Sequence, residues 1–190
     1  MFWRLPGVYA TSTGYIAGAV PHPTYEEVCS GRSGHAECVR VAYDASRLAF
    51  ADLLAMHWTC HDPTQGNRQG NDVGSQYRSG IYCSTEAQYE EATSSREAYQ
   101  RSLNAAGRKA PITTEITRPG ESTFYFAEDY HQQYLAKPMA RPYCSAQPTG
   151  APMPADWLAA RGAKLDAAFW SRHGPKPGCT INVPNAPIAI

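Results

Sequence analysis

The chain has 190 residues, 17 basic and 17 acidic side chains, and 43% hydrophobic residues. This length suits one domain with a core of ordinary size, and the balanced charge excludes a strongly basic surface for nucleic acid or anionic lipid. The sequence contains neither an apolar run of the roughly 20 residues that a membrane-spanning helix needs nor a secretory signal pattern. We therefore expect a monomeric intracellular protein, cytoplasmic or organellar, that acts on small molecules or peptides and has no nucleic-acid or membrane partner.

Residues 36–43 show the alternation of a strand. One face carries Glu37, Val39, Val41 and Tyr43, and the other carries Cys38, Arg40 and Ala42. This pattern predicts a strand with a carboxylate at its entrance. The next segment has apolar residues at helical spacing, namely Phe50, Leu53, Leu54, His57 and Trp58. It predicts an amphipathic helix that ends near Pro63, since proline disfavours continuation.

A polar loop follows, and after it the chain alternates between predicted strands and helices. Residues 79–83 favour a short strand, and Thr85 with Gln88 forms a capping-box pattern that opens a helix ending near Gly107. Residues 112–117 and 123–127 favour strands, and residues 128–137 favour a short helix that stops before Pro138. This mixture predicts an α+β two-layer sandwich, with helices on one face of a sheet.

The composition changes after Cys144. Residues 145–190 are rich in proline, alanine and glycine, and they contain one amphipathic helix candidate over 155–173. Its apolar positions, Trp157, Leu158, Leu165 and Phe169, could dock the helix on the domain. A mobile extension is the alternative, and the composition leaves both open.

The six cysteines are widely spaced, without a C-x-x-C pair. They are typical of reduced thiols in an intracellular protein and not of a secreted disulfide framework. Cys60, His61 and Cys83 could converge on zinc, but structural zinc sites normally pair ligands two to four residues apart. We therefore expect no metal and no cofactor.

Three motifs occur in an order and at a spacing typical of one enzyme family. They are PTYEEVCSGRSGHAE (23–37), HDPTQGNRQGNDVGSQYRS (61–79) and FAEDYHQQYLAK (126–137). Together they make residues 2–144 resemble the peptide-methionine (S)-S-oxide reductases, the type A methionine sulfoxide reductases. The resemblance implies a ferredoxin-like core over residues 1–144, whereas the composition alone makes residues 145–190 an irregular C-terminal extension. It also implies thiol-dependent reduction of methionine (S)-sulfoxide, free or in peptides and proteins, for repair of oxidative damage, with thioredoxin as the reductant.

The resemblance assigns roles to individual side chains. Glu37, in GHAE, matches the general acid that protonates the sulfoxide oxygen; Tyr25, Tyr77 and Tyr134 match tyrosines around the substrate; and Asp72 matches an aspartate that lines the site. An apolar strand face would raise the pKa of Glu37, as this role requires. On composition alone these residues are a solvated glutamate, packing tyrosines and a turn aspartate. We assign His61 and His131 to structure, each bonding backbone near a turn.

Two cysteines are candidates for a thiol relay. Cys144, in PYCS, matches the resolving cysteine of the family, and Cys179 is a candidate second relay thiol. Many family members have glycine after the resolving cysteine, whereas this chain has Ser145. The mobility of the segment is therefore expected to differ.

The family's nucleophile motif, GCFWG, does not occur in the 190 residues. The pair Phe2-Trp3 runs directly into LPGVYATSTGY, so it matches a second aromatic pair that lies about two helical turns after GCFWG in the family. We therefore expect that the first strand, the start of the first helix and a nucleophilic cysteine or selenocysteine lie upstream of Met1, and that the chain as printed is inactive. The alternative is a catalytically inactive truncated isoform, or a module that binds oxidised peptides.

Overall fold

The computed structural model describes residues 1–140, 143–175 and 188. In chain order its elements are η1 (Phe2–Arg4), β1 (Val8–Ile16), α1 (Tyr25–Cys29), β2 (Ala36–Tyr43), α2 (Phe50–Thr59), β3 (Arg68–Gln69), β4 (Asp72–Val73), η2 (Ser75–Tyr77), β5 (Gly80–Tyr82), α3 (Glu86–Ala105), β6 (Glu115–Thr117), β7 (Tyr125–Phe126), η3 (Tyr134–Ala136), α4 (Ala155–Ala160) and α5 (Ala167–His173). The chain therefore has the predicted α+β character. No helix in this described part is long and apolar enough to cross a membrane.

The longest pairing is antiparallel and joins β1 to β2. The main sheet has the order β2-β1-β7, with Tyr15 opposite Glu37 and Gly14 opposite Phe126. A side chain at Gly14 would collide with the Tyr125 carbonyl oxygen, only 2.3 Å from the position of an added Cβ, so β7 can approach β1 only at a glycine. The predicted strand over 36–43 is confirmed, whereas β1 had no predicted counterpart.

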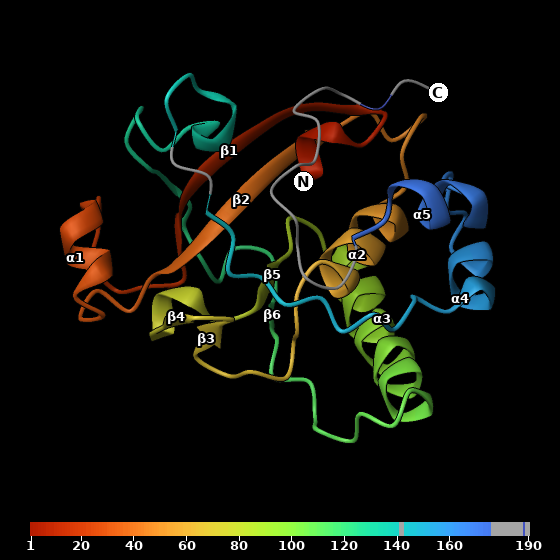
Figure 1. The fold of residues 1–190 in the computed structure, drawn as a ribbon. Helices are drawn as coiled ribbons and strands as arrows, with labels where there is room; N and C mark the ends of the chain where they lie inside the picture. The colour runs from red at the N-terminus through yellow and green to blue at the C-terminus, as the bar shows by residue number, and fades with distance from the viewer. Residues whose placement is uncertain (141–142, 176–187, 189–190) are drawn as a thin grey trace.

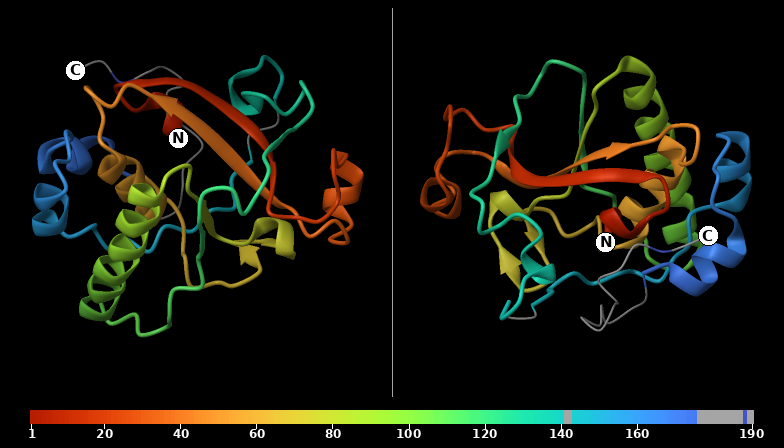
Figure 2. Two further views of the ribbon diagram at one scale, coloured as in Figure 1. Left: turned by 180° about the vertical axis from the view of Figure 1, so that it is seen from behind. Right: turned by 90° about the horizontal axis from the view of Figure 1, so that it is seen from above.

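Two smaller sheets complete the strands of the described residues. β3 and β4 form an antiparallel hairpin, and β5 pairs with β6 in parallel. Figures 1 and 2 show α2, α3, α4 and α5 gathered at one end of the long β1–β2 ribbon, while α1 and the β3–β4 hairpin lie at the other end. Because β2 starts at that second end, Glu37 is placed beside the hairpin and α1.

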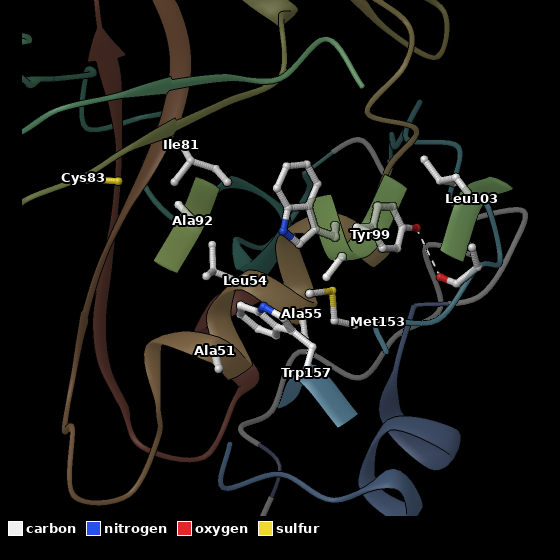
Figure 3. Packing of buried hydrophobic residues seen from close by; sticks show 13 residues of the cluster. Ala51, Leu54, Ala55, Ile81, Cys83, Ala92, Tyr99, Leu103, Met153 and Trp157 are labelled. Atoms are coloured by element: carbon white, nitrogen blue, oxygen red, sulfur yellow. Dashed lines mark hydrogen bonds between the residues drawn. The ribbon is translucent and has the colours of Figure 1, made fainter. Parts of the chain in front are cut away.

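The main core lies between α2 and α3. Trp58 of α2 is buried and stacks on Tyr99 of α3, with ring centroids 5.7 Å apart, and its indole N–H donates to Ser95 Oγ at 2.8 Å. Figure 3 shows Met153 and Trp157 entering the same cluster from the C-terminal segment. Both predicted helices are confirmed: α2 follows the apolar spacing, and Thr85 caps α3 by accepting from the Gln88 N–H at 3.2 Å.

The C-terminal segment docks on this core. Asp52 of α2 is buried, and its carboxylate accepts hydrogen bonds from the backbone N–H groups of Lys164, at 2.9 Å, and Leu165, at 3.1 Å. Trp157 and Leu165 are buried, so the mobile alternative is wrong for this part of the tail. The single helix predicted over 155–173 is two helices, because the chain turns between α4 and α5 at Gly162, whose φ is 66°.

The helix predicted over 128–137 is also wrong. This segment consists of turns and the short helix η3, and Gln133 adopts a left-handed φ of 51°. The Gln132 side chain accepts from the Thr13 N–H at 2.8 Å and donates to the Thr13 carbonyl at 2.9 Å. This side chain therefore continues the pairing of β1 where β7 ends, which holds the segment out of a helix. The strand predicted over 112–117 is shorter than expected and covers only β6.

Candidate functional site

Glu37 stands at the start of β2, and the turn before it is fixed by a buried histidine. His35 accepts a hydrogen bond from the Gly18 N–H at 3.1 Å and is 2.7 Å from the Val20 carbonyl through its other ring nitrogen, which requires a proton there. A Cβ at Gly18 would lie 2.3 Å from the His35 ring, so only glycine permits this contact. The GHAE motif thus anchors the strand entrance to the loop that follows β1.

The environment of Glu37 is less apolar than the strand pattern predicted. Val39, on the same face, is 49% exposed, and Glu37 itself keeps an exposed surface, so this face of β2 is not buried. Even so, the pKa of the Glu37 carboxyl is raised, first because neighbouring protein atoms displace water from it and second because of the negative charge of Asp72. The carboxyl is therefore held closer to its protonated form, as a proton donor requires.

Asp72 and Tyr77 are brought to Glu37 by the hairpin and the turn that follows it. Asp72 begins β4, and Tyr77 ends η2 three residues after Gly74, whose φ of 150° suits glycine. Partial burial raises the pKa of Tyr77, and the charge of Glu37 adds to this effect. Both phenol and carboxyl therefore favour their protonated, hydrogen-donating forms at the same place.

Tyr25 reaches the same site from α1. Thr24 caps this helix in a capping box with Glu27, whose carboxylate accepts from the Thr24 N–H at 2.8 Å. A hydrogen bond with Cys29 raises the pKa of Tyr25, and partial burial and the charges of Cys29 and Glu37 raise it further. Glu37, Asp72, Tyr77 and Tyr25 therefore interact across four separate elements.

Glu128, in the FAEDY motif, ties this site to the sheet. Its carboxylate accepts from the Tyr15 hydroxyl at 2.7 Å and from the Tyr25 backbone N–H at 2.9 Å. His131, one turn later, packs its ring on Tyr25 with centroids 4.5 Å apart. Its Nε2 is buried without a hydrogen-bond partner among the described residues, so this nitrogen does not make the backbone bond that we expected of His131, and the ring contacts Tyr25 instead.

The other predicted site residues are placed as follows. Tyr134 begins η3 with 43% of its surface exposed, and its place at the site stays a prediction. Cys144 is half-buried in a segment that lies along the β3–β4 hairpin. Cys179 lies outside the described residues.

His61 has the structural role that we predicted. Its Nδ1 lies 2.8 Å from the His57 carbonyl, and its Nε2 lies 2.8 Å from Ser79 Oγ. Burial lowers the pKa of His61 to about 4, which keeps the ring neutral. Within the described part of the chain, no group of three or more His, Cys, Asp or Glu side chains could hold a metal ion.

Arg78 is a residue of the site that the sequence analysis missed. It donates to Glu115 Oε1 at 2.9 Å, to the Gly34 carbonyl at 3.1 Å and to the Ser75 carbonyl at 2.9 Å. The Tyr82 hydroxyl donates to the same Glu115 oxygen at 2.5 Å. Arg78 therefore joins the turn that carries Tyr77 to the residues that precede Glu37. An arginine in a polar loop gives no sequence signal for this bridge.

Replacing Arg78 with glutamine should destabilise the protein by about 1–3 kcal/mol, since charge-assisted hydrogen bonds are lost and Glu115 keeps a partly buried charge. Arg78→Lys should recover less than half of the lost unfolding free energy. A single ammonium group cannot bond Glu115 and the Gly34 and Ser75 carbonyls together as the guanidinium does. The free energy of unfolding in urea measures both effects. Arg101→Gln, at an exposed position of α3, is the matched control. A change no larger than that of the control would contradict the bridge.

Comparisons with known proteins agree with the three motifs. The family description "Peptide methionine sulfoxide reductase" matches residues 1–155. A "Peptide methionine sulfoxide reductase MsrA" from Xanthomonas campestris pv. campestris (strain B100) is 58% identical over 153 residues, covering 80% of this chain and 69% of the relative. A protein of the same name from Xylella fastidiosa (strain M12) is 57% identical over 150 residues, covering 79% and 68%.

Solved structures give the same result. "Methionine sulfoxide reductase A of Corynebacterium diphtheriae" superposes with a TM-score of 0.69 at 44% identity and covers 80% of this chain and 75% of that one. The reduced form of Mxr1 from Saccharomyces cerevisiae has a TM-score of 0.64 at 32% identity, with 73% and 76% covered.

Proposed function

This chain belongs to the peptide methionine sulfoxide reductase family, and we propose that its clustered acid and phenols serve the reduction of methionine (S)-sulfoxide in the repair of oxidative damage. The observation that carries this proposal is the meeting of Glu37, Asp72, Tyr77 and Tyr25 from four elements at one end of the sheet. The substrates are free methionine sulfoxide and oxidised peptides or proteins.

Glu37 is the proton donor in this proposal. The oxygen of a sulfoxide is a poor leaving group, so it must be protonated as a nucleophile attacks the sulfur. The raised pKa of Glu37 supports this role, because more of the carboxyl is protonated near neutral pH than in an ordinary glutamate. Tyr25, Tyr77 and Tyr134 would donate hydrogen bonds to the oxygen or border the methyl group, and Asp72 would orient them.

A thiol relay completes the cycle. The nucleophilic thiolate attacks the sulfoxide sulfur while Glu37 protonates the oxygen. The bond from this oxygen to the methionine sulfur breaks, methionine leaves, and the protonated oxygen ends on the nucleophile's sulfur as a sulfenic acid. The Cys144 thiol then attacks this sulfenic sulfur and expels water, which forms a disulfide. Thioredoxin, as a dithiol, is the proposed reductant of that disulfide, with Cys179 as a candidate second relay thiol.

The nucleophile itself is proposed to lie in a GCFWG motif, which the 190 residues do not contain. Three other thiols are poor substitutes. Burial raises the pKa of Cys38 and of Cys60 to about 12 and that of Cys83 to about 11, so few of these thiols are ionised near neutral pH.

The 190-residue polypeptide should therefore show no sulfoxide reduction. A polypeptide in which the first strand, GCFWG and about two helical turns precede Phe2 should be active. The assay follows loss of the (S)- and (R)-sulfoxides of a peptide substrate with dithiothreitol, and only the (S) form should react. The extended polypeptide with serine in place of the motif cysteine is the matched control. Reduction by the unextended polypeptide would place the nucleophile among its own thiols. An inert extended polypeptide, folded as judged by circular dichroism, would contradict the proposed function.

A further inference from the structure

One carboxylate bonds the residues on both sides of Cys144. The Tyr143 hydroxyl donates to Asp72 Oδ1 at 2.8 Å, and the Ser145 hydroxyl makes a hydrogen bond with Asp72 Oδ2. Ser145 Oγ is also 2.9 Å from the Gln69 carbonyl, and since a hydroxyl has one proton it donates to one acceptor at a time. We call Asp72, Tyr143 and Ser145 the Asp72 clamp.

The backbone of the hairpin is shaped for this contact. Gly70 has a left-handed φ of 59°, and a Cβ at this position would lie 1.6 Å from the Ser145 carbonyl oxygen. Only glycine at position 70 lets the hairpin and the segment around Ser145 approach so closely. Two residues after Ser145, the side chain of Gln147 accepts a hydrogen bond through Oε1 from the Gln65 side-chain amide at 3.0 Å. The segment 143–147 is therefore laid along the hairpin side by side.

No regular secondary structure holds this segment. Residues 143–150 form neither helix nor strand, and Tyr143 is 51% exposed, whereas Ser145 is buried against the hairpin. The side-chain bonds to Asp72 thus replace the ladder of backbone bonds that would fix a strand. Serine in place of the glycine common in the family supplies one of these bonds.

We propose that Asp72 is a positioning residue that holds Cys144 beside the acid site through hydrogen bonds to Tyr143 and Ser145. This inference rests on the proposed function, because it gives meaning to the place of Cys144 only if that thiol enters the relay. Cys144 can then leave this position only when the hydrogen bonds of Tyr143 and Ser145 to Asp72 break. The rate of this opening sets how often the relay thiol is released.

The test measures how fast each cysteine of the 190-residue protein reacts with iodoacetamide, by mass spectrometry of its peptides. In Ser145→Ala the rate at Cys144 should rise about tenfold, because a hydrogen bond to a charged group no longer restrains local opening. Cys83 is buried in the core and reports global unfolding, so its rate should not change. Ser171→Ala, at an exposed position of α5, should alter neither rate.

Three results would overturn the clamp. They are an unchanged Cys144 rate in both Ser145→Ala and Tyr143→Phe, equal rises at Cys144 and Cys83, or full additivity of Ser145→Ala with Asp72→Asn. Full additivity would overturn the clamp because Ser145 and Asp72 are partners in one hydrogen bond. Once one partner is replaced, replacing the other cannot break that bond a second time. Ser145→Gly serves if the alanine variant does not fold.

Failure of the proposed function gives a different pattern. If Cys144 takes no part in sulfoxide reduction, the extended polypeptide keeps its thioredoxin-dependent turnover without this thiol, while the alkylation rates still respond to Ser145→Ala. If the clamp fails, the alkylation rates do not respond, whatever the turnover.

Discussion

Glu37→Gln should slow sulfoxide reduction by about 10²–10⁴-fold, the usual contribution of a positioned general acid. Glutamine keeps the size and hydrogen-bonding capacity of the side chain but has no proton to transfer. The measurement is the rate of reduction of a methionine (S)-sulfoxide peptide at saturation, in the extended polypeptide that carries the GCFWG cysteine. Glu90→Gln, at an exposed position of α3, is the matched control and should leave the rate unchanged. A loss below about threefold would remove Glu37 from the acid role.

The pH dependence gives this prediction an independent readout. Glu37 donates a proton only while it is protonated, so the rate should fall as pH rises through its pKa. That pKa is raised, first by burial and second by the charge of Asp72, so the falling limb should lie above the range of an ordinary glutamate. Asp72→Asn removes the second cause and should move the limb to lower pH. A limb that stays in place would show that Asp72 does not act on Glu37.

Local pattern was sufficient for some elements of this fold. The alternation over 36–43 and the apolar spacing over 50–58 were enough to predict β2 and α2, although β2 is largely exposed and α2 is buried almost all round. β1 was not predicted, since its residues mix exposed and buried positions and its partners are distant in the chain. Periodicity records which face is apolar, but it does not record which strand lies alongside.

The wrong predictions for residues 128–137 and 155–173 have a common physical cause. In each region, a hydrogen bond between a side chain and the backbone joins residues that are far apart in the sequence. Asp52 caps the chain at residues 164 and 165, and Gln132 pairs with Thr13, so both decide the path of segments more than 100 positions away. Neither residue has a local signal for this role. The candidate site shows the same division: the motifs indicated Glu37 and the residues around it, whereas the Arg78 bridge depends on the backbone carbonyls of Gly34 and Ser75.

Cys144→Ser in the extended polypeptide should reduce about one sulfoxide per chain and then stall with thioredoxin, because the sulfenic acid on the nucleophile has no thiol to resolve it into a disulfide. Rapid-quench measurement of product should show an initial burst of normal rate, followed by no further turnover. The clamp predicts that this serine variant keeps both hydrogen bonds to Asp72, since they are made by Tyr143 and Ser145.

The burst separates a resolving thiol from an attacking one. Loss of the burst would mean that Cys144 takes part in the first chemical step, which the proposed relay does not allow. Undiminished turnover would mean that another thiol resolves the sulfenic acid. The double variant Cys144→Ser with Cys179→Ser tests Cys179 for this role. A stall that appears only in the double variant would assign the resolving step to Cys179. Cys83→Ser, a buried core position, controls for the loss of any single thiol. Because dithiothreitol can reduce a sulfenic acid directly, it should restore turnover to Cys144→Ser where thioredoxin does not.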